Sequence, residues 1–401
     1  MKQRVLIVNK FYYPRGGDCV CTLNLERLLA DKGHEVAVYA MEYPDNLPSR
    51  WSGYFAPAVD FGAPLKGKLR AAARAMGWGD IRRSFAAILA DFKPEVVHLQ
   101  NIHSYLSPVL AEMAREAGAK VVWTLHDYKP ICPSYSCLRD GKPCEECFTS
   151  PSAVLRHRCM KGSLAASAVA WAEARKWNRR RLEHAVDTFI CPSSFLKSKM
   201  EQGGFSPEKL RVNCNFIGFD KIARLGASGD AESPIRGDFY CYVGRMSREK
   251  GVESLLEAAS RLPHRLVLAG DGPLLEELRS KYGSPNIEFA GRMTADQVVD
   301  LLRAARFSIM PSVCYENNPL GVIESLCAGT PVLGARIGGI PELIDEGRSG
   351  LVFESGDADD MARAIRVAFD TPWDNAAIRR SALARFSPER HYRDLLDAYS
   401  K

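Results

Sequence analysis

The chain has 401 residues, of which 46% are hydrophobic and 25% charged, a composition typical of a globular protein large enough for two domains. No apolar run reaches the roughly 20 residues that span a bilayer, and the first ten residues lack the apolar core of a signal peptide, so we expect a cytoplasmic protein. The net charge of +6 argues against a dedicated nucleic-acid binder and suits an acidic small ligand or an anionic membrane surface.

The first half opens with a strand–loop–helix–strand pattern. We predict strands at 4–9 and 35–40 and a helix at 19–32. The first loop places Gly16 and Gly17 just before the helix, where small residues let backbone N–H groups approach an anion or a sugar hydroxyl. The loop is too long for the glycine fingerprint of a dinucleotide fold, which disfavours an NAD-dependent dehydrogenase. A plain surface turn is the alternative.

Polar residues follow two further predicted strands, at 96–101 and 121–127. Ligands in open α/β sheets bind outside the carboxyl ends of the strands, so these residues are site candidates. A purely structural role for the histidines is the alternative. The candidates are Asn101, His103, His126 and Asp127.

Five of the twelve cysteines fall between residues 132 and 159. A Cys-x-x-Cys pair with further thiols on both sides offers more than the four ligands that a tetrahedral zinc ion needs. We therefore expect either a structural zinc ion or unliganded thiols, because the spacing matches no strict zinc-finger register. The five are Cys132, Cys137, Cys144, Cys147 and Cys159.

Two segments, 64–83 and 163–185, are basic and partly helical in pattern. In the second, arginines lie beside Trp171 and Trp177, and basic residues next to tryptophan suit an anionic membrane surface. The hydrophobic period is not clean, however, and we favour an ordinary surface helix, in which a solvated face covers a buried face.

The second half repeats the alternation of strands and helices after a polar, Gly- and Ser-rich stretch at 226–238. Such alternation predicts a parallel sheet wrapped by helices. The predicted strands are 239–244, 264–269, 286–291, 307–312 and 331–335. The predicted helices are 251–262, 274–282, 295–305, a helix opening near 319, 357–370 and 388–400.

Cations follow the first strand of the second half. Arg245 and Lys250 lie in the loop and at the start of the next helix, and two cations near a helix N-terminus suit a diphosphate. Ordinary solvated charges are the alternative. The turn at 270–273 ends a neighbouring strand and could approach the same ligand.

Two acids flank the opening of the helix near residue 319. Asn318 followed by Pro319 is a helix-entry signal, and Gly329 is the stop residue, which places Glu324 on the helix and Glu316 in the loop before it. No helical neighbour can neutralise Glu324. It is therefore either a ligand-binding acid or a buried acid paired with a distant cation.

The motifs GRMSREKG, LVLAGDGP, FAGR, PSVCYENNPLGVIESLCAGTPVLGARIGGIPELI and GRSGLVF resemble the second domain of retaining glycosyltransferases of family 4. That family has the α/β GT-B fold, in which two Rossmann-like domains face each other across a cleft and a C-terminal helix crosses back to the first domain. The resemblance implies an acceptor-side domain at 1–215 plus about 386–401, with a Cys-rich insert at 132–159, and a donor domain at 216–385.

The first half is similar, through its Gly-Gly loop and its LHDY–ICP segment, to bacterial transferases of capsule, O-antigen and exopolysaccharide assembly. In those relatives four matching cysteines accompany a Lys-Gly-Ser helix start, here 161–163, whereas Cys137 is an addition in this chain. The resemblance thus implies the zinc ligands Cys132, Cys144, Cys147 and Cys159.

The resemblance also implies roles for single residues. Glu324 would accept hydrogen bonds from the ribose of a nucleotide-sugar donor. Arg245 and Lys250 would hold the diphosphate. Glu316 and His126 would contact the donor sugar. Further donor contacts would come from Gly16, Gly17, Gly244, Asp271, Arg292, Asn317, Asn318, Pro319 and Leu320.

The activity that the resemblance implies is retaining hexosyl transfer from a UDP- or GDP-sugar to a lipid-linked bacterial surface glycan, by an enzyme peripheral to the inner face of the membrane. We expect no catalytic metal, because Arg245 and Lys250 can stabilise the departing diphosphate. A nucleotide-sugar epimerase of the same fold and a non-catalytic nucleotide or glycan binder are the alternatives.

Overall fold

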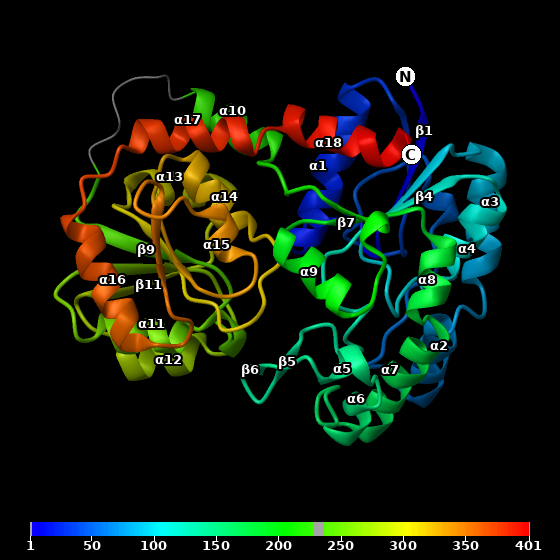
Figure 1. The fold of residues 1–401 in the computed structure, drawn as a ribbon, viewed down its shortest axis with the longest axis horizontal. Coiled ribbons are helices and arrows are strands. Elements are labelled where there is room, and N and C mark those ends of the chain that lie inside the picture. The colour runs from blue at the N-terminus through cyan, green and yellow to red at the C-terminus, as the bar shows by residue number, and fades with distance from the viewer. Residues whose placement is uncertain (1, 228–235, 401) are drawn as a thin grey trace. The chain divides into compact units, whose positions relative to one another are not determined.

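The computed structural model describes residues 2–227 and 236–400, which form two compact units (Figure 1). The first unit comprises Met1–Cys137, Cys144–Cys214 and Tyr392–Lys401, and the second comprises Leu138–Pro143 and Asn215–His391. Most of the polar stretch predicted at 226–238 lies outside the described residues. None of the described helices is both long enough and apolar enough to cross a membrane.

The first unit is built on a six-stranded parallel sheet in the order β2-β1-β3-β4-β7-β8. Its strands are β1 (Arg4–Val8), β2 (Glu35–Tyr39), β3 (Val96–Leu99), β4 (Lys120–Thr124), β7 (Thr188–Cys191) and β8 (Leu210–Val212). Its helices are α1 (Gly17–Asp31), α2 (Leu65–Ala75), α3 (Ile81–Phe92), α4 (Val109–Glu116), α5 (Glu146–Thr149), α6 (Ala153–Arg156), α7 (Leu164–Lys176), α8 (Arg179–Ala185) and α9 (Ser194–Gln202). The short 3-10 turns η1 (Ser52–Tyr54) and η2 (Pro207–Lys209) complete this unit.

The second unit contains another six-stranded parallel sheet, in the order β11-β10-β9-β12-β13-β14. Its strands are β9 (Phe239–Val243), β10 (Arg265–Ala269), β11 (Ile287–Gly291), β12 (Ser308–Met310), β13 (Val332–Ala335) and β14 (Gly350–Phe353). Its helices are α10 (Phe219–Ala227), α11 (Val252–Ala259), α12 (Leu275–Tyr282), α13 (Ala295–Ala304), α14 (Leu320–Cys327), α15 (Ile340–Leu343), α16 (Ala358–Asp370) and α17 (Asn375–Arg385). The turn η3 (Arg248–Lys250) and the hairpin β5 (Leu138–Arg139) and β6 (Lys142–Pro143) also belong to it.

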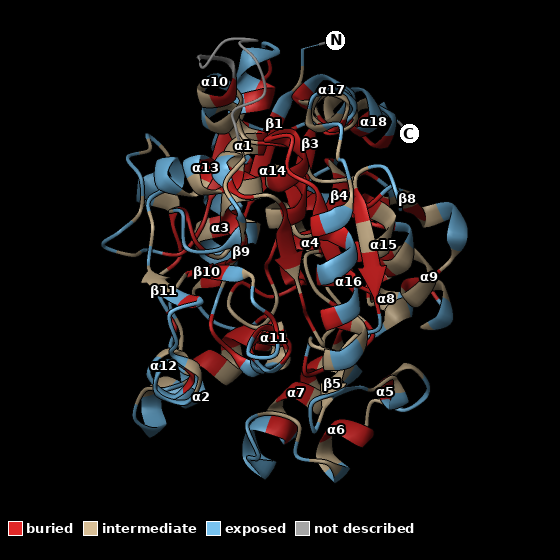
Figure 2. Cartoon of the chain, turned by 90° about the vertical axis from the view of Figure 1, so that its left-hand side faces the viewer, coloured by how far each residue is buried: buried red, intermediate tan, exposed pale blue. Residues whose placement is uncertain are grey.

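The central strands are buried on both faces, as all-parallel sheets require, because helices cover the sheet on either side (Figure 2). The alternating α/β pattern predicted from the sequence is therefore confirmed in both units. Between the two sheets, β8 ends at Val212 and α10 begins at Phe219.

Helix α18 (Pro388–Ser400) carries the chain from the second unit into the first, as expected for the last helix. Its second half packs into the core beneath the first sheet, where Leu395 and Tyr399 are buried beside Val5. The Tyr399 hydroxyl lies 2.7 Å from Nδ1 of His98, on β3. The first core is thus completed by residues from the far end of the chain.

Candidate functional site

The residues singled out from the sequence are distributed over both units, and each group is described within its own unit. In the second unit they follow the carboxyl ends of four adjacent strands, β11, β10, β9 and β12. Arg292 comes after β11, Asp271 after β10, Arg245 after β9 and Glu316 after β12. This edge of a parallel sheet is where α/β proteins bind ligands.

The turns that carry Arg245 and Asp271 touch through their backbones. The backbone N–H of Met246 donates to the carbonyl oxygen of Asp271 at 2.9 Å. Gly270 has a φ of +143°, and a Cβ there would lie 1.9 Å from the carbonyl oxygen of Gly244, so only glycine fits. The side chains of Arg245 and Asp271 are exposed at this edge.

Lys250 and Glu316 form an ion pair. The Lys250 Nζ lies 2.6 Å from Glu316 Oε1, and the Ser312 hydroxyl donates to the same oxygen at 2.7 Å. Burial alone would lower the pKa of Lys250, but the adjacent Glu316 carboxylate outweighs it and raises that pKa. The two residues that the resemblance assigns to the diphosphate and to the donor sugar are thus direct neighbours.

Glycines hold both ends of this pair in place. Gly251 follows Lys250 with a φ of +66°, and a Cβ there would lie 1.9 Å from the carbonyl oxygen of Pro311. Gly338, with a φ of +60°, packs in the same way against the backbone of Glu316, and the N–H of Gly339 donates to the Glu316 carbonyl oxygen at 2.7 Å. The close approach of backbone to backbone explains these glycines.

Helix α14 begins at Leu320, and its N-cap position falls on Pro319 rather than on Asn318. The predicted role of Asn318 as the helix cap is therefore wrong. Its Oδ1 accepts a hydrogen bond from the backbone N–H of Asn215 at 3.0 Å, and its carbonyl oxygen accepts from the Asn215 side chain at 2.9 Å. Gly329 ends the helix with a φ of +75°, as predicted.

Glu324 is paired with a cation from a distant part of the sequence, one of the two alternatives predicted for it. The Lys221 Nζ, on α10, forms an ion pair with Glu324 Oε1, and the two side chains are 23% and 14% exposed. Sequence reasoning missed Lys221, because nothing in its own helix links it to Glu324. An acid that is accessible and held by a cation remains able to accept hydrogen bonds from a ligand.

In the first unit, Gly16 and Gly17 stand at the N-terminus of α1. Gly16 is the N-cap residue and offers no side chain to the first turn. A Cβ on Gly17 would meet no atom within 4 Å, so open space lies in front of this helix end. The first turn of α1 thus has no side-chain cap, and anion binding at this helix end stays a prediction.

Asp18, in the first turn of α1, is joined to the end of β3. The Asn101 side-chain N–H donates to Asp18 Oδ2 at 2.8 Å. Burial works to raise the pKa of Asp18, but the neighbouring His126, Lys10 and Asn101 lower it by more, so the carboxyl group stays ionised. Sequence reasoning missed Asp18, although an acid directly after the Gly-Gly pair was a visible signal.

His126 follows β4, and its Nε2 lies 2.7 Å from Gln100 Oε1. Since a carbonyl oxygen can only accept, Nε2 carries the proton and Nδ1 is left to accept a hydrogen bond. Burial lowers the pKa of His126 by more than nearby Asp18 raises it, and Lys10 lowers it a little further. The imidazole is thus neutral near pH 7, and its tautomer is set by Gln100, which sequence reasoning also missed.

The other two candidates at this edge face each other. His103 Nε2 lies 3.8 Å from Asp127 Oδ1, and the backbone N–H of Lys129 donates to the same oxygen at 2.9 Å. Burial holds the pKa of His103 well below its usual value and raises that of Asp127. His103 also packs against Trp123, with ring centroids 5.0 Å apart, which gives it a structural role in the sheet.

The Cys-rich segment keeps its thiols together without disulfides. Hydrogen bonds from Cys137 and Cys147 lower the pKa of the Cys132 thiol to about 2. In the part of the chain that the structure describes, however, no three His, Cys, Asp or Glu side chains are arranged to hold a metal ion. Zinc binding by Cys132, Cys144, Cys147 and Cys159 stays a prediction.

The chain contains one Asp-x-Asp sequence, at 357–359, a type that can hold a metal ion on phosphates. Here Asp357 Oδ1 accepts hydrogen bonds from the backbone N–H groups of Asp359 and Asp360, at 2.9 and 3.0 Å, and so caps α16. Asp359 in turn pairs with Arg261 at 2.6 Å. These acids therefore serve the helix start.

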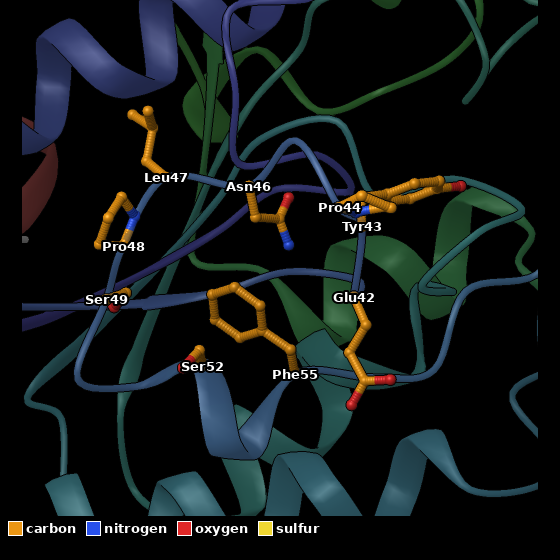
Figure 3. A pocket seen from close by; sticks show the side chains of 9 residues that line it. All are labelled: Glu42, Tyr43, Pro44, Asn46, Leu47, Pro48, Ser49, Ser52 and Phe55. Atoms are coloured by element: carbon orange, nitrogen blue, oxygen red, sulfur yellow. The ribbon is translucent and has the colours of Figure 1, made fainter.

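A pocket of about 420 Å³ opens in the first unit beyond β2 (Figure 3). None of the residues predicted from the sequence lines it. Asn46 is held there by a 2.7 Å hydrogen bond from its Nδ2 to the carbonyl oxygen of Met41, while its buried Oδ1 has no partner among the described residues. The pocket is lined by Glu42, Tyr43, Pro44, Asn46, Leu47, Pro48, Ser49, Ser52 and Phe55.

Two six-stranded parallel sheets with polar and charged residues at their carboxyl edges define a protein of two Rossmann-like units. A family model described as Glycosyltransferase Family 4 matches residues 15–221, and one described as Glycosyl transferases group 1 matches residues 238–370. The first match alone covers more than half of the chain. The chain belongs to glycosyltransferase family 4.

Curated relatives match part or most of the chain. The chain is 26% identical to sulfoquinovosyl transferase SQD2 of Arabidopsis thaliana over 69% of this chain and 50% of that protein. It is 25% identical to an uncharacterized 42.6 kDa protein in the cps region of Klebsiella pneumoniae, over 84% and 87%. It is 31% identical to the lipopolysaccharide core biosynthesis glycosyltransferase LpsE of Rhizobium meliloti, over 45% and 53%. The matches thus span about half the length of the first and third of these relatives.

Solved structures share the whole fold. Anabaena HepE in complex with UDP and glucose aligns with a TM-score of 0.65 at 17% identity, over 100% of both chains. Sucrose-phosphate synthase from Thermosynechococcus elongatus aligns with a TM-score of 0.68 at 19% identity, over 99% of this chain and 100% of that one. The predicted GT-B fold is confirmed.

Proposed function

We propose that this glycosyltransferase transfers a hexose from a UDP- or GDP-sugar to a growing, lipid-linked bacterial surface glycan, with retention of configuration. The observation that carries the proposal is the Lys250–Glu316 ion pair of 2.6 Å at the carboxyl edge of the second sheet. A cation and an acid in contact can serve adjacent parts of one donor, since the cation suits the diphosphate and the acid suits the sugar hydroxyls.

In this proposal the second unit binds the donor. Breaking the bond between sugar and phosphate leaves negative charge on the departing diphosphate, which Lys250 and Arg245 would stabilise. The N-terminus of α14 would add to this effect. Glu324 would accept hydrogen bonds from the ribose hydroxyls in exchange for part of its contact with Lys221.

We propose further donor contacts at the residues that the family resemblance implied. The backbone from Asn317 to Leu320 would meet sugar hydroxyls and phosphate, and the main chain near Arg292 would meet the base. Gly244 and Asp271 would line the diphosphate from the two turns that touch each other. Gly16 and Gly17 would offer the N-terminus of α1 to the diphosphate.

The role of His126 follows from its tautomer. With Nε2 donating to Gln100, the lone pair on Nδ1 can accept a hydrogen bond from a hydroxyl of the transferred sugar. Asp18 lies near this ring as an ionised carboxylate, so it would favour a sugar ring that gains positive charge. Gln100 and Asn101 would act as positioning residues for these two groups.

The acceptor belongs to the first unit in this proposal. The pocket beyond β2 offers the aromatic faces of Tyr43 and Phe55, the carboxylate of Glu42 and the unpaired Asn46 Oδ1, a combination that suits sugar rings with their hydroxyl groups. The names of LpsE and of the cps-region protein support a surface glycan as the acceptor. We place the enzyme in the cytoplasm, peripheral to the inner face of the membrane.

The donor is tested by calorimetry and thermal shift with UDP, GDP and their sugars, because a ligand that binds the folded protein raises its melting temperature. UDP is the first choice, since HepE, with the same fold, is seen with UDP and with UDP-glucose. Incubation with radiolabelled donors then separates transfer from isomerisation by an epimerase and from binding alone. Absence of binding by every nucleoside diphosphate would overturn the proposal.

A structural zinc ion in the Cys-rich segment is part of the proposal. It is supported by the hydrogen bonds that the Cys132 sulfur accepts from the thiols of Cys137 and Cys147 within the segment. Elemental analysis of freshly purified protein decides it, with about one zinc per chain expected. Protein without zinc that is folded and active would leave these cysteines as unliganded thiols.

A further inference from the structure

Helix α2 presents an apolar stripe to the outside of the first unit. Its core-facing side consists of Ala71, Arg74 and Ala75, all buried. On the opposite side Leu65 and Leu69, one helical turn apart, are 72% and 62% exposed. Ala72, Ala73 and Met76 continue the same side at helical spacing.

Trp78 extends the stripe beyond the end of the helix. It is 59% exposed, and together with Leu65 and Leu69 it is one of the three most exposed large hydrophobic residues in the described chain. Its ring lies 4.7 Å from the Lys176 Nζ. Three large apolar side chains gathered within fourteen positions of sequence are unlike the scattered surface residues of an ordinary soluble face.

Cations flank this stripe. The exposed cations of the segment are Lys66, Lys68, Arg70, Arg82 and Arg83. The acid that faces them, Asp80, is already engaged by Arg70 and by the buried Arg74, each at 2.5 Å. The surface around the stripe is therefore net positive.

The helix is firmly attached to the rest of the first unit. The indole N–H of Trp177 donates to the carbonyl oxygen of Ala75 at 2.8 Å, and Trp177 is buried. The Arg74 guanidinium also donates to the carbonyl oxygen of Pro57, at 3.2 Å. The sequence-based suggestion that Trp177 contacts a membrane is therefore wrong. Trp177 is buried and instead supports the core-facing side of α2.

We propose that α2 and Trp78 dock this protein on an anionic lipid bilayer, with Leu65, Leu69 and Trp78 inserted at the interface and the flanking cations on the lipid headgroups. A helix with exposed leucines, a tryptophan and lysines at its borders has the chemistry of an interfacial membrane helix. The positive surround selects an anionic surface, because each lysine or arginine near such a surface is attracted to its lipids. The proposed lipid-linked acceptor explains why the enzyme would need to bind a membrane. Binding to the bilayer itself requires neither the donor nor the acceptor.

The test is co-sedimentation of the full chain with two kinds of vesicle, phosphatidylcholine alone and phosphatidylcholine mixed with phosphatidylglycerol. We expect binding to the mixed vesicles that weakens as salt rises. Leu65→Ser/Leu69→Ser and Lys66→Glu/Lys68→Glu should each weaken it about tenfold or more. Leu164→Ser and Val367→Ser, at other exposed apolar positions, are matched controls and should bind as the unmodified protein does.

Trp78 supplies a second readout. Its fluorescence should shift to shorter wavelength on mixed vesicles, and Trp78→Phe should remove that shift while the other tryptophans remain. Circular dichroism and melting temperature confirm that each variant is folded.

Equal binding of the Leu65→Ser/Leu69→Ser variant, or no binding of the unmodified protein to mixed vesicles, would overturn the proposal. The proposal would also be overturned if gel filtration showed the unmodified protein to be a dimer and this variant to be a monomer that still binds mixed vesicles. Donor binding by calorimetry, unchanged in these variants, keeps this result separate from the proposed chemistry.

Discussion

Lys250 and Glu316, which are 66 positions apart in the sequence, meet at 2.6 Å at the carboxyl edge of the second sheet. Each neutralises the other in the structure, so a diphosphate that binds Lys250 must share or displace the carboxylate. Binding of the leaving group and placement of Glu316 against the sugar are therefore coupled in the proposed mechanism.

We expect Lys250→Met to weaken the binding of UDP or GDP by about 10- to 100-fold, the loss that accompanies removal of one charge-assisted hydrogen bond. Glu316→Gln should leave nucleoside diphosphate binding intact, because the cation is then no longer shared, while transfer falls roughly a hundredfold or more. Calorimetry and steady-state transfer rates measure the two effects. Arg248→Met, which removes an exposed cation from the same turn, is the control and should change neither.

For Glu324 the prediction concerns the ribose. Glu324→Gln should weaken binding of the ribonucleotide about tenfold or more, since a hydrogen bond to a charged group is lost. It should not weaken binding of the analogue that lacks the 2′ and 3′ hydroxyls, because those groups are the proposed partners. Calorimetric titration of both nucleotides into both proteins forms a closed cycle. An equal loss for the two nucleotides would show that Glu324 acts through the fold, by way of Lys221.

The pH dependence should follow His126. Burial lowers its pKa below the ordinary value of 6.5, so the neutral, active ring persists as the pH falls below 6.5, and activity is lost only when the pH passes the lowered pKa. Gln100→Glu places a carboxylate on Nε2, beside the existing Asp18 and Lys10, and should move this acid limb to higher pH.

Two controls accompany the Gln100 variant. Gln100→Leu removes the hydrogen bond without adding charge, so it should lower kcat and leave the acid limb without an upward shift. Gln202→Glu, an exposed substitution at the end of α9, should leave the profile unchanged. An acid limb that does not respond to Gln100→Glu would assign the titration to another group.

The buried pair of Lys129 and Glu173 should matter for stability. Their charged atoms are 2.9 Å apart, both side chains are almost fully buried, and Glu173 also accepts hydrogen bonds from Ser104. Glu173→Gln leaves a buried ammonium without its counter-charge, which should cost about 3–5 kcal/mol of unfolding free energy. Urea unfolding followed by circular dichroism measures it.

The half-exposed pair of Lys197 and Glu201, on α9, is the matched comparison. Glu201→Gln should cost only about 0.3–0.5 kcal/mol, because surface pairs one helical turn apart contribute little. If the two variants lost similar stability, burial would give the Lys129–Glu173 pair no special role in holding the fold.

The sequence sufficed for features that repeat locally. The alternation of strands and helices, the left-handed glycine at 329 and the cation-bearing loop after β9 all follow from patterns within a dozen residues. It failed where the partner lies far along the chain, as for Asn318 with Asn215 or Asp18 with Asn101. Periodicity shows which face of an element is buried, but only the folded chain brings two such faces together.

Lys221 and Gln100 illustrate the same limit at the candidate site. Both lie outside every motif that carries the family resemblance, and each contacts a residue inside one, Lys221 pairing with Glu324 and Gln100 with His126. The helices α3, α4 and α17 were likewise absent from the expected elements, since no site residue drew attention to them. The fold class was predictable from the sequence, whereas the residues that tune the site were not.

The packing of α18 has a consequence for the order in which the protein is made. Leu395 and Tyr399 fill the core beneath the first sheet, and the Tyr392 hydroxyl reaches His34 at 2.7 Å. During synthesis these residues leave the ribosome only after the whole second unit, although domains at the start of a chain generally fold first. The first unit therefore emerges with an open core and can finish folding only once the second unit has been made.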